Sequence, residues 1–104
     1  MRKDRKDLAK KIIKANRKKL SDRLYEEIIE HLSSASFSYT VRFFPARVFY
    51  NEKHRTEFER LAVFLGVYRN IRWSSKNFVE VDLDANQIAS LIRQEYVTRI
   101  RSRA

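Results

Sequence analysis

Alternating acids are the residues of this 104-residue chain that come closest to supporting catalysis. Glu80, Asp82 and Asp84 are spaced so that Glu80 and Asp82 would share one face of a strand. Metal-dependent nucleases hold a divalent cation with such acids, with a lysine nearby to assist the water. Arg72, on the strand expected beside them, cannot carry a proton as that lysine does. An exposed strand face followed by a helix cap at Asp84 therefore explains these acids better, and a nuclease is only our third hypothesis.

No other residue set favours an enzyme. His31 and His54 lack a carboxylate cluster at ligand spacing, and Glu27, one helical turn before His31, would complete only a pair. The chain has no Cys, which excludes disulfides, thiolate metal sites and thiol nucleophiles. Its one glycine, Gly66, cannot form a dinucleotide fingerprint or a P-loop. We therefore expect no catalytic residue, no metal and no cofactor.

The excess positive charge lies at the two ends of the chain. Residues 1–23 carry a net charge of +8, residues 24–96 a net charge of −1, and residues 97–104 a net charge of +3. A near-neutral body with basic ends favours a negatively charged partner, and nucleic acid is the commonest one.

Residues 3–19 are predicted to form a helix, with Leu8, Ala9, Ile12 and Ile13 on its apolar face. Five cations fall within an arc of roughly 80° on the opposite face. This stripe could neutralise several phosphates. The alternatives are a solvated helix face and docking on an acidic protein; a membrane surface is less favoured because the apolar face lacks Trp and Phe. The stripe consists of Lys3, Lys6, Lys10, Lys14 and Arg17, with Lys11, Lys18 and Lys19 beside it.

A basic hairpin is the second candidate site. Strands at 67–73 and 78–83 are expected around a loop at 74–77, with Trp73 near the tip. Such a hairpin could enter a minor groove or stack an unpaired base on the indole. The alternative for Trp73 is a core or rim residue packed against the last helix. A winged helix-turn-helix ends in a similar hairpin but needs two helices before it, where this sequence predicts one. The hairpin cations are Arg69, Arg72 and Lys76.

The C-terminal arginines are the third candidate. Asp84 and Gln87 form a capping box that begins a helix predicted to continue to about residue 101, with Tyr96 and Ile100 on its apolar face. Arg99, Arg101 and Arg103 would then point in scattered directions, as in a fraying tail.

Aromatic residues are concentrated in the middle of the chain, where eleven of the thirteen lie between residues 37 and 78. A solvent-exposed sheet face carrying them could stack single-stranded bases. However, the alternation over 37–44 places Phe37, Tyr39, Val41 and Phe43 together on the core face of a strand. No RNA-recognition-motif sequence is present either, so a stacking platform is less favoured.

The remaining signals complete the expected fold. Ser21 can cap a second helix that the serines of 33–36 interrupt, and Pro45 ends or bends the first strand. Residues 47–50 form a short strand or an irregular crossover. Asn51 caps a helix over 52–65, and Gly66 suits its left-handed C-terminal cap.

Together these elements predict an α+β fold with a small, mainly antiparallel sheet of three or four strands, packed by helices, and an N-terminal helical pair. One domain would span 1–104, with a basic helix at 1–19 and a basic tail at 97–104. The expected function is non-catalytic nucleic-acid binding, DNA or RNA, in an accessory or regulatory role in the cytoplasm and away from membranes. The alternative is an inhibitor or adaptor whose basic helix docks on an acidic protein. The oligomeric state stays open, because one small core need not use the whole apolar face of the first helix.

Overall fold

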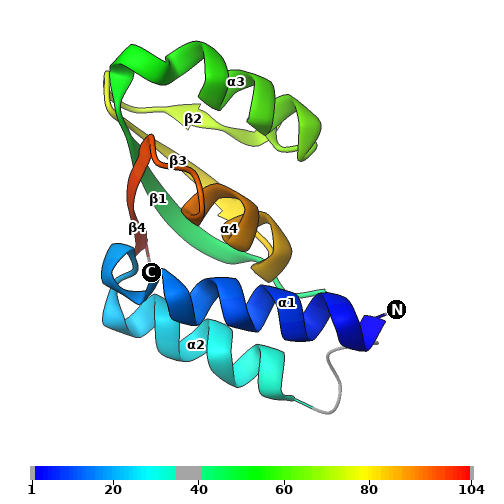
Figure 1. Ribbon diagram of the computed structural model, residues 1–104. Helices are drawn as coiled ribbons and strands as arrows, with labels where there is room; N and C mark the ends of the chain where they lie inside the picture. Colours follow the sequence, from blue (N-terminus) through cyan, green and yellow to red (C-terminus); the bar gives the residue numbers. More distant parts are fainter. Residues whose placement is uncertain (1, 35–40, 104) are drawn as a thin grey trace.

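The computed structural model describes residues 2–34 and 41–103, with side chains described from residue 6 onward (Figure 1). In this part the chain forms four α-helices and four strands, which confirms the α+β class and the N-terminal helical pair. Three short 3-10 helices, labelled η, join them. The elements are α1 (Arg2–Ala15), η1 (Arg17–Lys19), α2 (Asp22–Ser33), β1 (Phe44–Tyr50), η2 (Glu52–His54), α3 (Arg55–Phe64), η3 (Tyr68–Asn70), β2 (Arg72–Trp73), β3 (Phe78–Leu83), α4 (Ala85–Ile92) and β4 (Val97–Ser102).

The four strands form one antiparallel sheet in the order β2-β3-β1-β4. From β1 onward the chain runs strand, helix, strand, strand, helix, strand, and the two middle strands of the sheet are β1 and β3. This is the split β-α-β arrangement. Figure 1 shows the α1–α2 hairpin at one end of the molecule and α3 at the other, with the sheet and α4 between them.

One face of the sheet supplies the core. Along β1, Phe44, Ala46, Val48 and Tyr50 are buried and the residues between them are half-exposed. Helix α4 covers this face with the fully buried Ile88, Leu91 and Ile92 among others, and α1 packs along α4 through Ala9 and Ile13. Full burial of each of these Ile and Leu side chains contributes about 1.5–3 kcal/mol to the stability of the fold.

The expected caps are largely confirmed. The Asn51 side chain accepts a hydrogen bond from the backbone N–H of Lys53 (3.0 Å), and Gly66 has a φ of 74°. Asp84 and Gln87 form the reciprocal capping box at the start of α4, with hydrogen bonds of 2.8 and 2.9 Å. Ser21 lies at the N-cap of α2, but its hydroxyl accepts a hydrogen bond from the Ser102 N–H instead of capping the helix.

The predicted strand at 37–44 is wrong in position and phase. The strand begins at Phe44, while Val41 and Phe43 precede it and are 70% and 56% exposed. Phe37 and Tyr39 lie outside the described residues. Because strand side chains alternate, a shift of one residue moves every side chain to the other face, and the core takes the even-numbered positions. Pro45 does not end this strand, since proline is tolerated near the start of a strand.

The stretch expected as a strand at 67–73 is mostly a turn. Gly66 N–H bonds to Val63 O and Val67 N–H bonds to Ala62 O, both at 3.0 Å, which is the hydrogen-bond pattern of a Schellman cap. The cap leads directly into η3, so only Arg72 and Trp73 pair with β3. The four-residue loop at 74–77 is confirmed, and the winged-helix alternative is wrong because α3 is the one α-helix between β1 and this hairpin.

The predicted final helix is wrong beyond Ile92. Val97–Ser102 instead form β4, which pairs with β1. The register shifts between Phe49 and Tyr50, so Val97 and Ile100 both face the core although they are three residues apart. The bulge gives buried residues the three-residue spacing that is typical of a helix. Pairing with β1 nevertheless makes this segment a strand.

Candidate nucleic-acid interface

The cations of α1 and η1 do not form one solvent-facing stripe. The buried side of α1 is centred on Ala9 and Ile13, so Lys6 and Lys10 lie on its flank and are half-buried. The Lys6 ammonium donates a hydrogen bond to Ser34 O (3.4 Å), beyond the end of α2. The exposed cations of this segment are Lys11, Lys14, Arg17 and Lys18, and the side chain of Lys3 lies outside the described residues.

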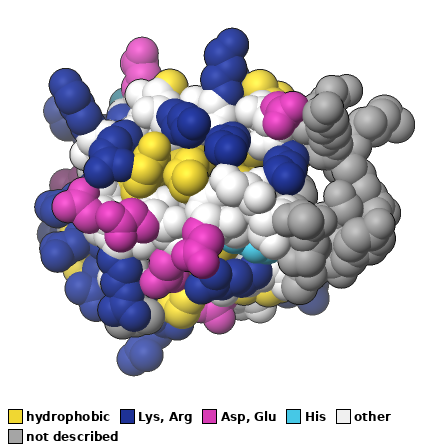
Figure 2. Space-filling view, turned by 90° about the horizontal axis from the view of Figure 1, so that it is seen from below, with side chains coloured by type: hydrophobic (Ala, Val, Ile, Leu, Met, Phe, Trp, Pro, Cys, Tyr) yellow, Lys and Arg dark blue, Asp and Glu magenta, His cyan; other side chains and the backbone are white. Residues whose placement is uncertain are grey.

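Helix α2 brings acids beside this basic surface. Arg17 lies 3.8 Å from the Asp22 carboxylate and 4.1 Å over the Tyr25 ring. Glu26 and Glu30 are exposed along α2. Figure 2 views this hairpin and shows dark blue cations, magenta acids and a yellow apolar strip on one surface. Acids therefore relieve the basic surface on its α2 side.

Four lysines of α1 and η1 have no ion-pair partner in the part of the chain that the structure describes. Within the described residues, no ion pair reaches Lys10, Lys11, Lys14 or Lys18. We call these four residues the α1 lysines. Seven of the eight charged residues between positions 6 and 19 are cationic, which leaves a strongly positive local field.

Lys19 has a structural role in the same charge run. Its ammonium donates to Ile92 O (3.2 Å) and Gln94 O (3.0 Å) and so closes the C-terminal end of α4. A cation at this end of a helix also interacts favourably with the helix dipole.

The outward side of the sheet gathers arginines from three strands and the residue after β4. The register places Arg72, Glu80, Arg47 and Arg101 in one row across β2, β3, β1 and β4. Because alternate strand residues share a face, Arg99, Arg101 and Arg103 point to the same side. The expectation that they scatter is wrong, since it depended on a helix. We call this side the open sheet face.

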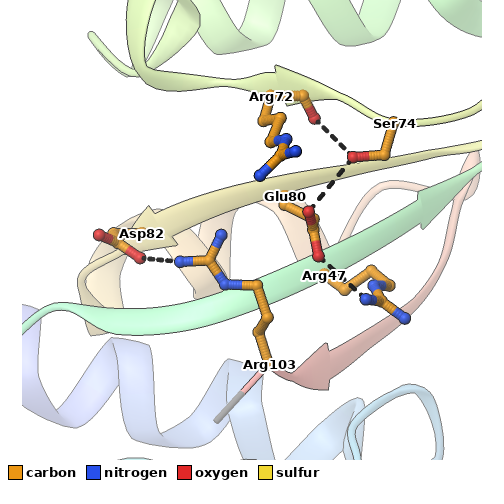
Figure 3. Close-up of polar contacts among 6 residues, drawn as sticks. All are labelled: Arg47, Arg72, Ser74, Glu80, Asp82 and Arg103. Carbon is orange, nitrogen blue, oxygen red and sulfur yellow. Dashed lines mark hydrogen bonds and ion pairs between the residues drawn. The ribbon is translucent and has the colours of Figure 1, made fainter.

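The two acids of the open sheet face are already paired. Arg47 lies 2.9 Å from Glu80, to which Ser74 also donates (3.3 Å), and Arg103 lies 3.1 Å from Asp82 (Figure 3). The hydrogen bond from Arg47 holds the pKa of Glu80 below its usual value. Within the part of the chain that the structure describes, Arg72, Arg99 and Arg101 have no ion-pair partner.

Two phenylalanines lie on the open sheet face. Phe49 of β1 and Phe78 of β3 are directly opposite in the register, and their ring centroids are 5.2 Å apart. The Arg47 guanidinium lies 5.1 Å from the Phe78 centroid. Both rings are half-buried, so part of each surface meets solvent.

Trp73 belongs to the inner side instead. Its ring makes edge contacts with Tyr50, Phe58 and Tyr68, and Arg55 lies 4.4 Å over it. The rim placement that we held as the alternative is correct, although the neighbouring helix is α3 and not the last helix.

The hairpin cations do not share one surface. Arg69 is exposed in η3, Arg72 is on the open sheet face, and Lys76 is exposed in the loop.

The histidines form no catalytic arrangement among the described residues. His31 packs edge-on against Phe44 (5.9 Å), and burial followed by the charge of Arg42 lowers its pKa. His54 lies 3.0 Å from Glu57. No group of three or more potential metal ligands occurs in the ranges that the structure describes, and no helix there is long and apolar enough to cross a membrane.

Sequence reasoning missed Arg47, Phe49 and Phe78. The signal was present in the alternation over 44–50, where even positions are apolar or aromatic and Arg47 lies between them. If Phe44 is taken as the first inward-facing residue of the strand, the alternation places Arg47 and Phe49 together on the outward face.

Comparison with known proteins finds no match to this chain among family models, curated proteins or solved structures.

Proposed function

We propose that this protein binds nucleic acid non-catalytically through the phosphate backbone, using the α1 lysines, in an accessory or regulatory role. The observation that carries the proposal is the set of four lysine charges without an ion-pair partner among the described residues. Phosphates meeting such cations release condensed counterions, which gives affinity that falls steeply with salt. Backbone contacts position a protein without reading sequence, so we expect weak sequence preference from this surface.

The scale of the effect follows from the number of phosphates engaged. If the four α1 lysines each neutralise one phosphate of a duplex, the slope of log K against log salt is about −3.6 from this surface alone. Removing two of them makes the slope shallower by about 1.8.

The test is fluorescence anisotropy with labelled duplex DNA, single-stranded DNA and structured RNA over a salt series. The variant Lys14→Gln/Lys18→Gln is compared with Lys53→Gln/Arg60→Gln, which removes the same charge from exposed positions of η2 and α3. We expect the first variant to flatten the salt slope and the second to leave it within about 0.5 of the wild-type value. Equal slopes in the two variants, or no binding to any probe, would refute the proposal.

A protein partner is the second candidate, either at the basic helix or elsewhere. The observation that favours one is the apolar surface of α3 and η3, where Val63, Phe64 and Tyr68 are 62%, 85% and 40% exposed. A shallow hollow of about 430 Å³ adjoins Val63 and Tyr68. Exposed apolar patches commonly mark protein interfaces. Binding to a protein would lose less affinity to salt and would depend on a few apolar hot spots.

A further inference from the structure

The open sheet face combines two features that the α1 surface lacks, aromatic rings and a regular ladder of arginines. No aromatic residue occurs between positions 2 and 19, so α1 and η1 themselves offer no ring on which a base could stack. On the sheet, one row of the register contains Phe78, Phe49 and Arg99. The next outward row contains Arg72, Glu80, Arg47 and Arg101.

The arginine ladder runs along an edge of the sheet. Outward residues on a strand repeat about every 7 Å, so the side chains of Arg99 and Arg101 leave β4 at about that spacing, and Arg103 follows just after the strand on the same side. Successive phosphates of an extended single strand are separated by a similar distance. Arg103 is shared with Asp82, whereas Arg99 and Arg101 have no ion pair within 6–34 and 41–103.

The acids of this face do not cancel its charge. Five arginines stand against Glu80 and Asp82, and each acid is held by one arginine. Electrostatic complementarity therefore favours an anionic partner on the open sheet face.

The phenylalanine pair determines which anion fits. Phe49 and Phe78 lie next to the arginines in the two middle strands, with their rings 5.2 Å apart. Aromatic rings beside a cationic track stack unpaired bases, whereas the bases of a duplex are stacked on one another and are not available. A single strand can place its bases on the rings and its phosphates on the arginines of β4.

The two basic surfaces adjoin each other. Segment η1 contacts β4, and the Ser21 N–H bonds to Ile100 O (3.1 Å) at this edge of the sheet. A nucleic-acid strand bound along the β4 arginines could therefore continue onto the surface that carries Lys18.

From this geometry we infer that the open sheet face binds single-stranded nucleic acid, with bases on Phe49 and Phe78 and phosphates on Arg99 and Arg101. The inference rests on the proposed function for the class of partner, and it adds a second surface and a preference for unpaired strands.

The experiment measures binding of labelled oligothymidine and of a DNA duplex to two sheet variants. Phe49→Leu/Phe78→Leu keeps the apolar character but removes stacking, and we expect it to weaken oligothymidine binding about tenfold or more while duplex binding changes less than about twofold. Arg99→Gln/Arg101→Gln should flatten the single-strand salt slope by about 1.4. Lys53→Gln/Arg60→Gln is the charge-matched control, and thermal unfolding followed by the fluorescence of the single Trp shows that each variant is folded.

The outcomes separate this inference from the proposed function. If Lys14→Gln/Lys18→Gln weakens binding and neither sheet variant does, the open sheet face is not a site and the proposed function stands. If the sheet variants weaken duplex and oligothymidine equally, the preference for single strands is refuted. If polyglutamate competes as well as oligothymidine, the face belongs to an acidic protein and the inference is wrong. If no nucleic acid binds the wild-type protein, both proposals fail.

Discussion

Lys18 and Lys19 are adjacent in the sequence, yet the structure gives them different roles. Lys18 is exposed and has no ion pair among the described residues, whereas the half-buried Lys19 ammonium donates to Ile92 O and Gln94 O. Replacing each by Met keeps the aliphatic stem and removes the charge. We predict that Lys19→Met lowers the stability of the fold with little effect on nucleic-acid binding. Lys18→Met should weaken nucleic-acid binding and leave the stability nearly unchanged.

The size of the Lys19 effect follows from its two hydrogen bonds. A hydrogen bond from a charged donor contributes about 1.5–3 kcal/mol when buried. Here the site is half-buried and Gln94 O also accepts from the Val97 N–H (3.1 Å), so water and the remaining bond compensate in part. We therefore expect a loss of about 1–2 kcal/mol, which lowers the Tm by roughly 5–10 °C for a domain of this size.

The assay is thermal and urea unfolding, followed by the fluorescence of Trp73, which contacts Tyr50 and Phe58 in the core. The salt slope of duplex binding is measured on the same samples. Lys18→Met should change the slope by about 0.9 and leave the Tm within about 2 °C. The reasoning is refuted if Lys19→Met leaves the Tm unchanged, or if both variants flatten the slope equally.

Three further predictions concern stability and pH. Because Arg47 lowers the pKa of Glu80 from 4.5, the ion pair stabilises the fold above that pH, and this stabilisation is lost as the pH falls. In urea titrations, Glu80→Gln should be less stable than wild type at pH 7 and should lose less stability than wild type between about pH 5 and pH 3. Since burial lowers the pKa of His31 from 6.5, protonation favours the unfolded chain, and His31→Gln should show a flatter stability profile than wild type from about pH 7 down to pH 5.5. Asp84→Ala removes the capping box of α4 and should lower the free energy of unfolding by about 1 kcal/mol in urea titrations. Asp84→Asn should retain most of that stability, because Asn is also a good N-cap.

Local signals in the sequence predicted the elements that local interactions determine. Asn51, Gly66 and Asp84 were placed correctly because a cap or a left-handed turn depends on a few neighbouring residues. The α1–α2 pair followed from helical apolar spacing, because each helix buries one face against the rest of the molecule.

The two main errors arose where pairing between distant strands decides the structure. Tyr96 and Ile100 suggested a continued helix, but pairing with β1 makes residues 97–102 a strand, and a bulge against Tyr50 brings Val97 and Ile100 to the core. The alternation was assigned one residue out of phase, which placed Phe43 instead of Phe44 in the core. Neither register nor bulge is visible without the partner strand.

The candidate site was predictable only in part for the same reason. The charge of the α1 lysines is apparent from composition, but the acids of α2 beside them required the folded hairpin. The open sheet face depends on the register of three strand pairs, so no single segment could have indicated that Arg99, Phe49 and Phe78 share a row.

The most direct test of the central claim is an NMR titration of the isotope-labelled protein with a DNA duplex and, separately, with oligothymidine. We predict that the duplex perturbs the backbone amides of residues 10–18, and that oligothymidine also perturbs Phe49, Phe78 and residues 99–103. Perturbations confined to the apolar surface of α3 and η3, or their absence with both ligands at low salt, would contradict nucleic-acid binding through the α1 lysines.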